Sequence, residues 1–415
     1  MNPLPLSAQI YVFMSAVTPR QSRWAVSLIF AINGFLYANW VSRLPRLQEM
    51  YGFDHGQLGL VLLLSSLGAL AAMPLTGRVI VRVGSHRITR SMLVVFCLLT
   101  PLLPVFPSGW GLGLVLLVLG AASGALDVAM NAQAVEVELR LRKPVLSSFH
   151  AIFSAGMMLG AASGALFNRL ETALFVHLLL VSSLGLLGAV WAVRRLIPEI
   201  READGPAISI RQNMLQRPEL LLLGLIAFCC MLGEGAMADW TTNYLEKVSA
   251  GGRYWSPMGL VAFATAMMIT RFLGDGARQR WGDTVLLRGG ALLATFGMGM
   301  ALAWPVIWTG ILGFFLVGMG LATIVPIAYS TAGSLPGLPA GVGISMVTTI
   351  GYAGFLLGPP VIGFVSKWQG LRVGMGFVFL LFVIMLALNF LGARLFKGRK
   401  KLTNAISPDL IPAKR

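Results

Sequence analysis

Long apolar stretches alternate with short polar intervals along the whole chain. A helix needs about 20 mostly apolar residues to cross a bilayer. Twelve stretches meet this length, at residues 23–43, 57–78, 88–106, 110–138, 147–168, 172–194, 218–246, 255–276, 284–303, 305–331, 341–366 and 372–395. The pattern therefore predicts an all-α membrane protein with twelve transmembrane helices.

The longest polar interval, between the sixth and seventh stretches, contains prolines, glycine and acidic residues. It divides the chain into six spans and six spans. We therefore expect a cytoplasmic N-terminal segment (1–22), two six-helix bundles (23–195 and 218–396), a cytoplasmic linker (196–217) and a basic cytoplasmic tail (397–415).

The two halves resemble each other at a shift of about 200 residues. The first and seventh spans contain Ala-Asn-Trp and Ala-Asp-Trp, ending at Trp40 and Trp240. The matching glycines are Gly113 and Gly120 with Gly313 and Gly320, and Gly156 and Gly160 with Gly354 and Gly358. Parallel half-repeats of six spans, with a solute site between them near the membrane midplane, are typical of secondary transporters. We therefore expect two pseudo-symmetric six-helix bundles.

Composition agrees with a chain dissolved in lipid. Hydrophobic residues make up 56% of the sequence and charged residues 12%, whereas soluble domains carry about 25% charged residues. The 48 glycines favour close packing of helices in lipid. The net charge of +16 is spread between apolar stretches, so it indicates membrane topology and no nucleic-acid partner.

Basic residues predict the orientation of the chain. With the N-terminus in the cytoplasm, 25 of the 32 Lys and Arg residues fall on the cytoplasmic side and seven outside. Because basic residues accumulate in cytoplasmic loops, we expect both termini inside. The first 20 residues lack the pattern of a cleaved signal peptide.

Other classes of protein are disfavoured. The four histidines are scattered, and Cys97, Cys229 and Cys230 lie in apolar runs without metal-ligand spacing, so we expect no enzyme, cofactor or metal site. A filter-like re-entrant segment is lacking, which argues against a channel. A non-transporting sensor on the same fold remains open.

Three acidic residues lie well inside predicted spans, where buried charge usually marks function. Glu234, flanked by two glycines, is nearest the middle of its span and is the first candidate for proton coupling. Asp127 and Asn131 share a helix face, and with His150 they form a second candidate cluster. Structural roles remain open for Asp127 and His150. For Asp239 we expect a structural role, in which its carboxylate pairs with the outer loops.

A solute site between the halves is the further hypothesis. Amides and phenols suit hydroxyl groups, and aromatic faces suit sugars or cations. Trp40 and Trp240 are predicted either to belong to the aromatic belt at the membrane interface or to form an outer gate, and the sequence favours neither alternative. The candidate lining residues are Asn33, Tyr37, Trp40, Asn131, Gln133, Trp240, Tyr329 and Tyr352.

These features resemble the major facilitator superfamily over essentially the whole chain. Its motif between the second and third spans is matched at Gly77, Arg82 and Gly84, although Val81 replaces the family's acidic residue. In the second copy, Asp275 before Arg280 and Gly282 could do a comparable job. We treat these six residues as the conformational loop motif.

More narrowly, the chain resembles the MosC/YbjJ-like branch of bacterial transporters. The motifs that carry this resemblance are Asn39-Trp40 with Arg43-Leu44-Pro45, residues 124–131, Ser147-Ser148-Phe149-His150, Glu234-Gly235 with Asp239-Trp240, and Gly358-Pro359-Pro360.

The resemblance implies a monomeric secondary transporter in the bacterial inner membrane. It implies alternating access and proton-coupled symport of a small polar solute such as a sugar or polyol. The alternative is a proton-coupled efflux antiporter for amphipathic drugs or metabolites. The fifth span, around Gly156, Gly160 and Gly164, lacks the Gly-Pro-rich motif of drug antiporters, which disfavours multidrug efflux.

Overall fold

The fold is a bundle of long helices. The computed structural model describes residues 18–142, 145–198, 217–335 and 340–406, without the side chains of residues 275, 340–342 and 393–406. The predicted segment 1–22 and linker 196–217 therefore lie largely outside the described residues, whereas the backbone of the predicted tail 397–415 is described as far as residue 406, as part of the last helix. In the first half the helices are α2 (Pro19–Val41), α3 (Leu44–Tyr51), α4 (His55–Val83), α5 (Ser85–Leu99), α6 (Gly109–Leu141), α7 (Leu146–Arg169) and α8 (Leu174–Val193).

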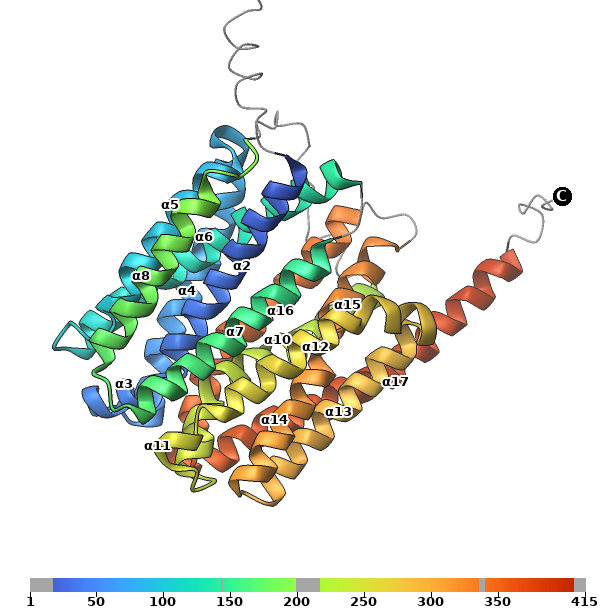
Figure 1. The fold of residues 1–415 in the computed structure, drawn as a ribbon. Coiled ribbons are helices and arrows are strands. Elements are labelled where there is room, and N and C mark those ends of the chain that lie inside the picture. Colours follow the sequence, from blue (N-terminus) through green and yellow to red (C-terminus); the bar gives the residue numbers. More distant parts are fainter. Residues whose placement is uncertain (1–17, 143–144, 199–216, 336–339, 407–415) are drawn as a thin grey trace, which may run out of the picture.

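The second half repeats this order (Figure 1). Its helices are α10 (Pro218–Lys247), α11 (Gly252–Trp255), α12 (Met258–Trp281), α13 (Asp283–Ala303), α14 (Ile307–Leu321), α15 (Ile324–Gly333), α16 (Ala340–Gln369) and α17 (Leu371–Ile406). Within the described residues, eleven segments are long and apolar enough to cross a membrane. The predicted helical membrane protein is confirmed.

Two predicted spans differ in detail from the observed helices. The third, 88–106, is the shorter helix α5, which gives way to a 3₁₀ turn (Thr100–Leu102) and packs beside α6 and α8. The tenth, 305–331, is divided into α14 and α15. Pro326 has no N–H to donate to the Ala322 carbonyl, which accounts for the break.

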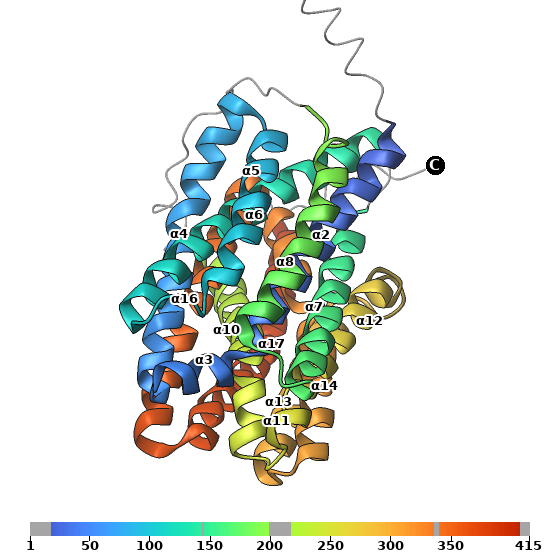
Figure 2. The same ribbon diagram turned by 60° about the vertical axis from the view of Figure 1, so that its left-hand side comes forward.

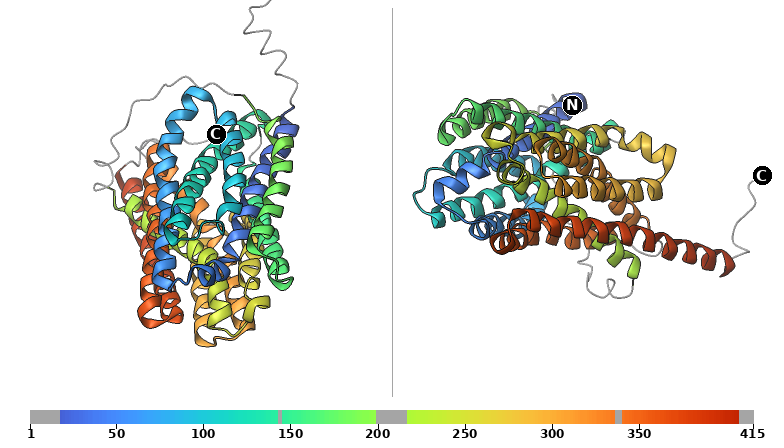
Figure 3. Two further views of the ribbon diagram at one scale, coloured as in Figure 1. Left: turned by 90° about the vertical axis from the view of Figure 1, so that its left-hand side faces the viewer. Right: turned by 90° about the horizontal axis from the view of Figure 1, so that it is seen from below.

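The small helices define the two ends of the bundle. The helices α3 and α11 lie together at one end, which we call the α3 end. The start of α2 and the end of α8, which precedes the predicted linker, lie at the opposite end, which we call the linker end (Figures 1 and 2). The view from below shows α17 extending past the bundle toward the C-terminus (Figure 3).

Glycines bring equivalent helices of each half into backbone contact. A Cβ built on Gly120 of α6 would lie 1.9 Å from the Ser65 carbonyl oxygen of α4. A Cβ on Gly318 of α14 would lie 2.4 Å from the Phe263 carbonyl oxygen of α12. The two glycines, Gly120 and Gly318, are 198 residues apart, and the residues that they contact, Ser65 and Phe263, are separated by the same number. The structural counterpart of Gly120 is therefore Gly318 and not the predicted Gly320.

The first and fifth spans of each half pack in the same way. Gly156 of α7 faces the Ala31 carbonyl of α2, and Gly354 of α16 faces the Phe228 carbonyl of α10. Between the halves, α7 packs on α12 and α4 packs on α16. Each half is thus a tightly packed unit, and two helix pairs form most of the contact between them.

The loop motif has a backbone role at its final glycines. Gly84 joins α4 to α5 with φ 83° and ψ 146°, and Gly282 joins α12 to α13 with φ 75° and ψ 163°. Residues other than glycine rarely adopt this conformation. Gly77 and Arg82 are exposed.

Among the described residues, the second copy of the motif contains an ion pair between Arg278 and Asp283. Arg278 pairs with Asp283 at 2.6 Å and binds Ser330 of α15 at 2.9 Å. Arg280 lies over the Trp281 ring. The Asp275 side chain is outside the described residues.

Gln133 fastens the linker end of the first half. Its fully buried amide donates to the Ser85 hydroxyl (2.7 Å) and the Ile197 carbonyl (2.8 Å). Its oxygen accepts from the Ile197 N–H (2.9 Å). One side chain thereby ties α6 to the α4–α5 corner and to the chain that follows α8.

We expect Gly120→Ala to lower the melting temperature of the purified protein in detergent. The added methyl group overlaps the α4 backbone, and overpacking costs about 1–3 kcal/mol. Gly77→Ala is the matched control, because no atom lies within 4 Å of its Cβ position. Equal melting temperatures for the two variants would contradict this packing.

We expect Gln133→Leu to lower the melting temperature by several degrees as well. The change leaves the Ile197 N–H and carbonyl without the bonds that the amide makes to them, at about 1–3 kcal/mol for each buried group, and it removes one bond of the Ser85 hydroxyl. Gln279→Leu, at an exposed position of α12, should have little effect. Stability unchanged in Gln133→Leu would show that the amide is dispensable for folding.

Candidate functional site between the halves

A carboxylate on α6 connects the two halves near the middle of the bundle. Asp127 Oδ2 accepts a hydrogen bond from the Tyr352 hydroxyl of α16 at 3.1 Å. Its Oδ1 accepts from the Asn131 amide at 3.2 Å. The helix face predicted to carry Asp127 and Asn131 is therefore turned toward the second half. We call these three residues the Asp127 cluster.

A second cluster contains a charge pair. Arg271 of α12 lies 3.2 Å from Glu234 Oε1 of α10, and it donates to the Ser154 hydroxyl of α7 at 3.0 Å. The Glu234 and Arg271 side chains are 20% and 15% exposed, so both charges are largely removed from solvent. These three residues form the Glu234 cluster, in which Arg271 is bound to both halves of the protein.

Arg271 was not among the predicted site residues. Arg271 is one of the 25 basic residues predicted to lie on the cytoplasmic side, because it lies close to the end of the predicted span 255–276. The structure corrects that assignment, since α12 continues to Trp281 and Arg271 points into the bundle. A single arginine inside an apolar run was the available signal.

His150 lies on the side of the Glu234 cluster. Its ring packs edge-on against Phe30 at 5.5 Å, and its charged neighbour is Arg271. Its carbonyl accepts from Ser154, the residue that binds Arg271. Among the described residues no hydrogen bond joins His150 to Asp127 or Asn131, so the predicted three-residue cluster is not formed in this structure.

The other candidate residues divide into two groups. Asn33 donates to the Met130 sulfur at 3.6 Å, and the Tyr329 hydroxyl donates to the Met231 sulfur at 3.8 Å. Sulfur is a weak acceptor, so both polar groups keep capacity for a stronger partner. The Gln133 amide, in contrast, is occupied by its three structural bonds, and we leave it out of the proposed site.

The two tryptophans lie inside the protein. Trp40 is 2% exposed and Trp240 is fully buried, so an interfacial belt facing lipid does not describe them. Trp40 packs on Tyr37 at 5.6 Å, and Trp240 packs on His55 at 6.0 Å. Asp239 is buried beside Tyr37 rather than paired with the outer loops.

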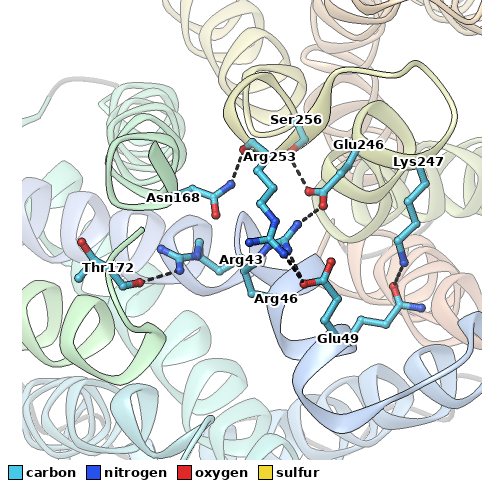
Figure 4. Close-up of polar contacts among 10 residues, drawn as sticks. Arg43, Arg46, Glu49, Asn168, Thr172, Glu246, Lys247, Arg253 and Ser256 are labelled. Atoms are coloured by element: carbon cyan, nitrogen blue, oxygen red, sulfur yellow. Dashed lines mark hydrogen bonds and ion pairs between the residues drawn. The ribbon is translucent and has the colours of Figure 1, made fainter. Parts of the chain in front are cut away.

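A charged network joins the halves at the α3 end (Figure 4). Arg46 of α3 pairs with Glu246 of α10 and with Glu49 on its own helix. Glu49 also pairs with Arg253 of α11 at 3.3 Å, and Lys247 donates to the Gln48 side chain at 2.6 Å. We call these six residues the α3-end network.

A further ion pair lies on the other side of this end. Lys367 of α16 is 3.1 Å from Asp54, which caps α4. The Gln57 backbone N–H and the Lys367 ammonium hold the pKa of Asp54 below its usual range, so this carboxyl is ionised at neutral pH. The α3 end is thus closed by contacts from both sides.

Within the described residues no group of three or more His, Cys, Asp or Glu could hold a metal ion. The polar groups of the two clusters and their neighbours are carboxylates, one guanidinium, amides and phenols.

Comparison with known proteins agrees with this arrangement. The model of the Major Facilitator Superfamily matches residues 26–352. A transporter of Sinorhizobium fredii named y4wD is 33% identical over 83% of this chain and 91% of its own length. An MFS-type transporter of Yersinia pestis is 34% identical (91% and 97% covered), and the membrane protein MosC of Rhizobium meliloti is 32% identical (87% and 88% covered).

Solved structures show the same fold. A mutant of the nucleoside transporter NupG superposes with a TM-score of 0.74 at 11% identity, covering 89% of this chain and 99% of that one. A bacterial homologue of the human lysosomal transporter Spinster, solved inward-facing and unoccupied, gives 0.68 at 16% identity, covering 91% and 97%. The chain belongs to the major facilitator superfamily.

Proposed function

We propose that this transporter carries a small polar solute, such as a sugar or polyol, across the bacterial inner membrane by proton-coupled symport. The observation that supports this most is the Glu234 cluster. A carboxylate and a guanidinium are costly inside a membrane protein unless they pair with each other or serve a pathway. Here they pair, and the guanidinium also binds Ser154 in the opposite half.

The geometry of this pair supports proton coupling. A protonated Glu234 no longer balances the charge of Arg271, so the bond from Arg271 to Ser154 becomes the main contact of a buried cation. Protonation therefore changes a contact between the halves. In a carrier whose halves rock against each other, that change links the protonation state to the conformation.

The solute class rests on the uncharged polar groups around the two clusters. Asn33, Asn131, Tyr329 and Tyr352 present amides and phenols from both halves. These groups donate and accept hydrogen bonds in the way that hydroxyl-rich solutes require. We propose Asn33, Asn131, Tyr329 and Tyr352 as lining residues, with Tyr37, Trp40 and Trp240 on the side of the α3 end.

The orientation is part of the proposal. The basic residues predict that the linker end faces the cytoplasm, and helix order places α3 and α11 at the opposite end. The α3-end network then closes the outer side of the site. Efflux of amphipathic molecules by proton antiport is the alternative, and the same carboxylates would serve it.

A thermal-shift screen of the purified protein at several pH values tests the solute class. A ligand present at 100 times its dissociation constant stabilises the folded state by about 2.7 kcal/mol. We expect sugars or polyols to raise the melting temperature. A shift produced by amphipathic drugs alone would favour the antiporter.

With a solute from that screen, we expect Glu234→Gln to abolish uptake driven by a pH gradient in proteoliposomes. The amide cannot release a proton, so the gradient has no group to act on, while exchange of labelled for unlabelled solute continues. Glu136→Gln is the control, because its partner Arg140 lies on the same helix. Proton-dependent uptake unchanged in Glu234→Gln would exclude this residue as the coupling group.

A further inference from the structure

The short helix α3 carries charges toward the opposite half. It follows the first long helix and spans eight residues, Leu44–Tyr51. Three of its polar side chains reach partners on α10 and α11 in the second half. The contacts are Arg46 with Glu246, Gln48 with Lys247, and Glu49 with Arg253. Three polar contacts thus leave one short helix and cross between the halves.

The start of α3 is fastened to its own half. Arg43, just before α3, donates to the Thr172 carbonyl at 3.0 Å and contacts His177 Nδ1 at 3.3 Å. Because a guanidinium only donates, Nδ1 is the acceptor, and the Nε2–H of His177 donates to the Asn39 side chain at 2.8 Å. The beginning of α3 therefore moves as one body with the first half.

The crossing contacts differ in burial. Arg46 and Glu246 are 12% and 11% exposed, whereas Glu49 and Arg253 are 46% and 59% exposed. Exposed ion pairs contribute little to stability, but removing one partner of a buried pair leaves an uncompensated charge. The second oxygen of Glu246 also accepts from the Ser256 hydroxyl at 3.1 Å. The Arg46–Glu246 pair is therefore the strongest contact of the network.

We infer that α3 is an ionic latch, in which Arg46 on the first half holds Glu246 on the second half and keeps the α3 end closed. Its release is the step that allows this end to open. Water enters as the halves separate and solvates both charges, so the same pair is stable when closed and tolerable when open. This inference concerns conformation and does not depend on which solute is carried.

The latch can be tested by distance measurements between spin labels, without a solute. One reporter pair joins Val105, in the connection between α5 and α6, with Val306, in the connection between α13 and α14; both side chains are exposed, and the two connections lie on opposite halves at the α3 end. The second pair joins Val79, near the end of α4, with Val285, near the start of α13; both side chains are exposed, and these helix ends lie on opposite halves at the linker end. Each valine is replaced by cysteine in a protein whose three buried cysteines, Cys97, Cys229 and Cys230, are replaced by alanine.

We expect Glu246→Gln to add a longer distance between the labels at the α3 end and a shorter one at the linker end. The population open at the α3 end should rise about tenfold or more, as expected for loss of a buried charge pair. Arg253→Gln should produce a smaller rise, because its ion pair is exposed. Glu136→Gln removes an ion pair within α6 and should leave both distances unchanged.

Three outcomes would overturn the latch. Unchanged distances in both Glu246→Gln and Arg46→Gln would show that other contacts keep the α3 end closed. A larger effect of Arg253→Gln than of Glu246→Gln would show that the Arg46–Glu246 pair is not the main contact that keeps this end closed. Longer distances at both ends would show that the halves merely separate. Size-exclusion profiles and melting temperatures identify any variant that fails to fold, and Arg46→Gln then replaces Glu246→Gln.

Discussion

A carboxylate and a guanidinium lie in the interior of a largely apolar bundle, and each is tolerated there because the other is present. Glu234 and Arg271 come from different helices of the second half, so their attraction fixes how α10 and α12 face each other. Arg271 binds Glu234 through Nη2 and uses Nη1 to bind Ser154 in the first half. A charge balance inside one half is in this way connected to a contact between the halves.

That connection is useful because each half is stiff. The glycines at the α4–α6 and α12–α14 contacts bring backbones so close that even a methyl group would collide with a carbonyl oxygen. Helices packed in this way shift together rather than one at a time. A change at Arg271 is therefore transmitted to a whole six-helix body, and the two bodies meet mainly through α7 with α12 and α4 with α16.

Apolar length and the internal repeat were sufficient to predict the helical membrane fold with its two halves, because burial in lipid imposes a long and uninterrupted apolar pattern. The pairing of Asp127 with Asn131 followed from helical periodicity alone. Partners that are distant in sequence were harder to predict. Nothing in the neighbourhood of Arg271 indicates Glu234, and nothing in α3 indicates Glu246, because each pair forms through the packing of separate helices. Gln133 looked like a solute ligand for the same reason, since its partners Ser85 and Ile197 are 48 and 64 residues away.

The bonds of Gln133 also determine where the tether between the halves begins. The chain is fixed at Ile197 by this amide, and the second half starts its first helix at Pro218. A chain of some twenty residues reaches at most about 70 Å when fully extended, far more than the rocking of two packed bundles requires. The length of the covalent connection therefore does not limit the relative rotation of the halves. The relative position of the two halves is set by the helix contacts and ion pairs between them, as in a complex of two separate subunits.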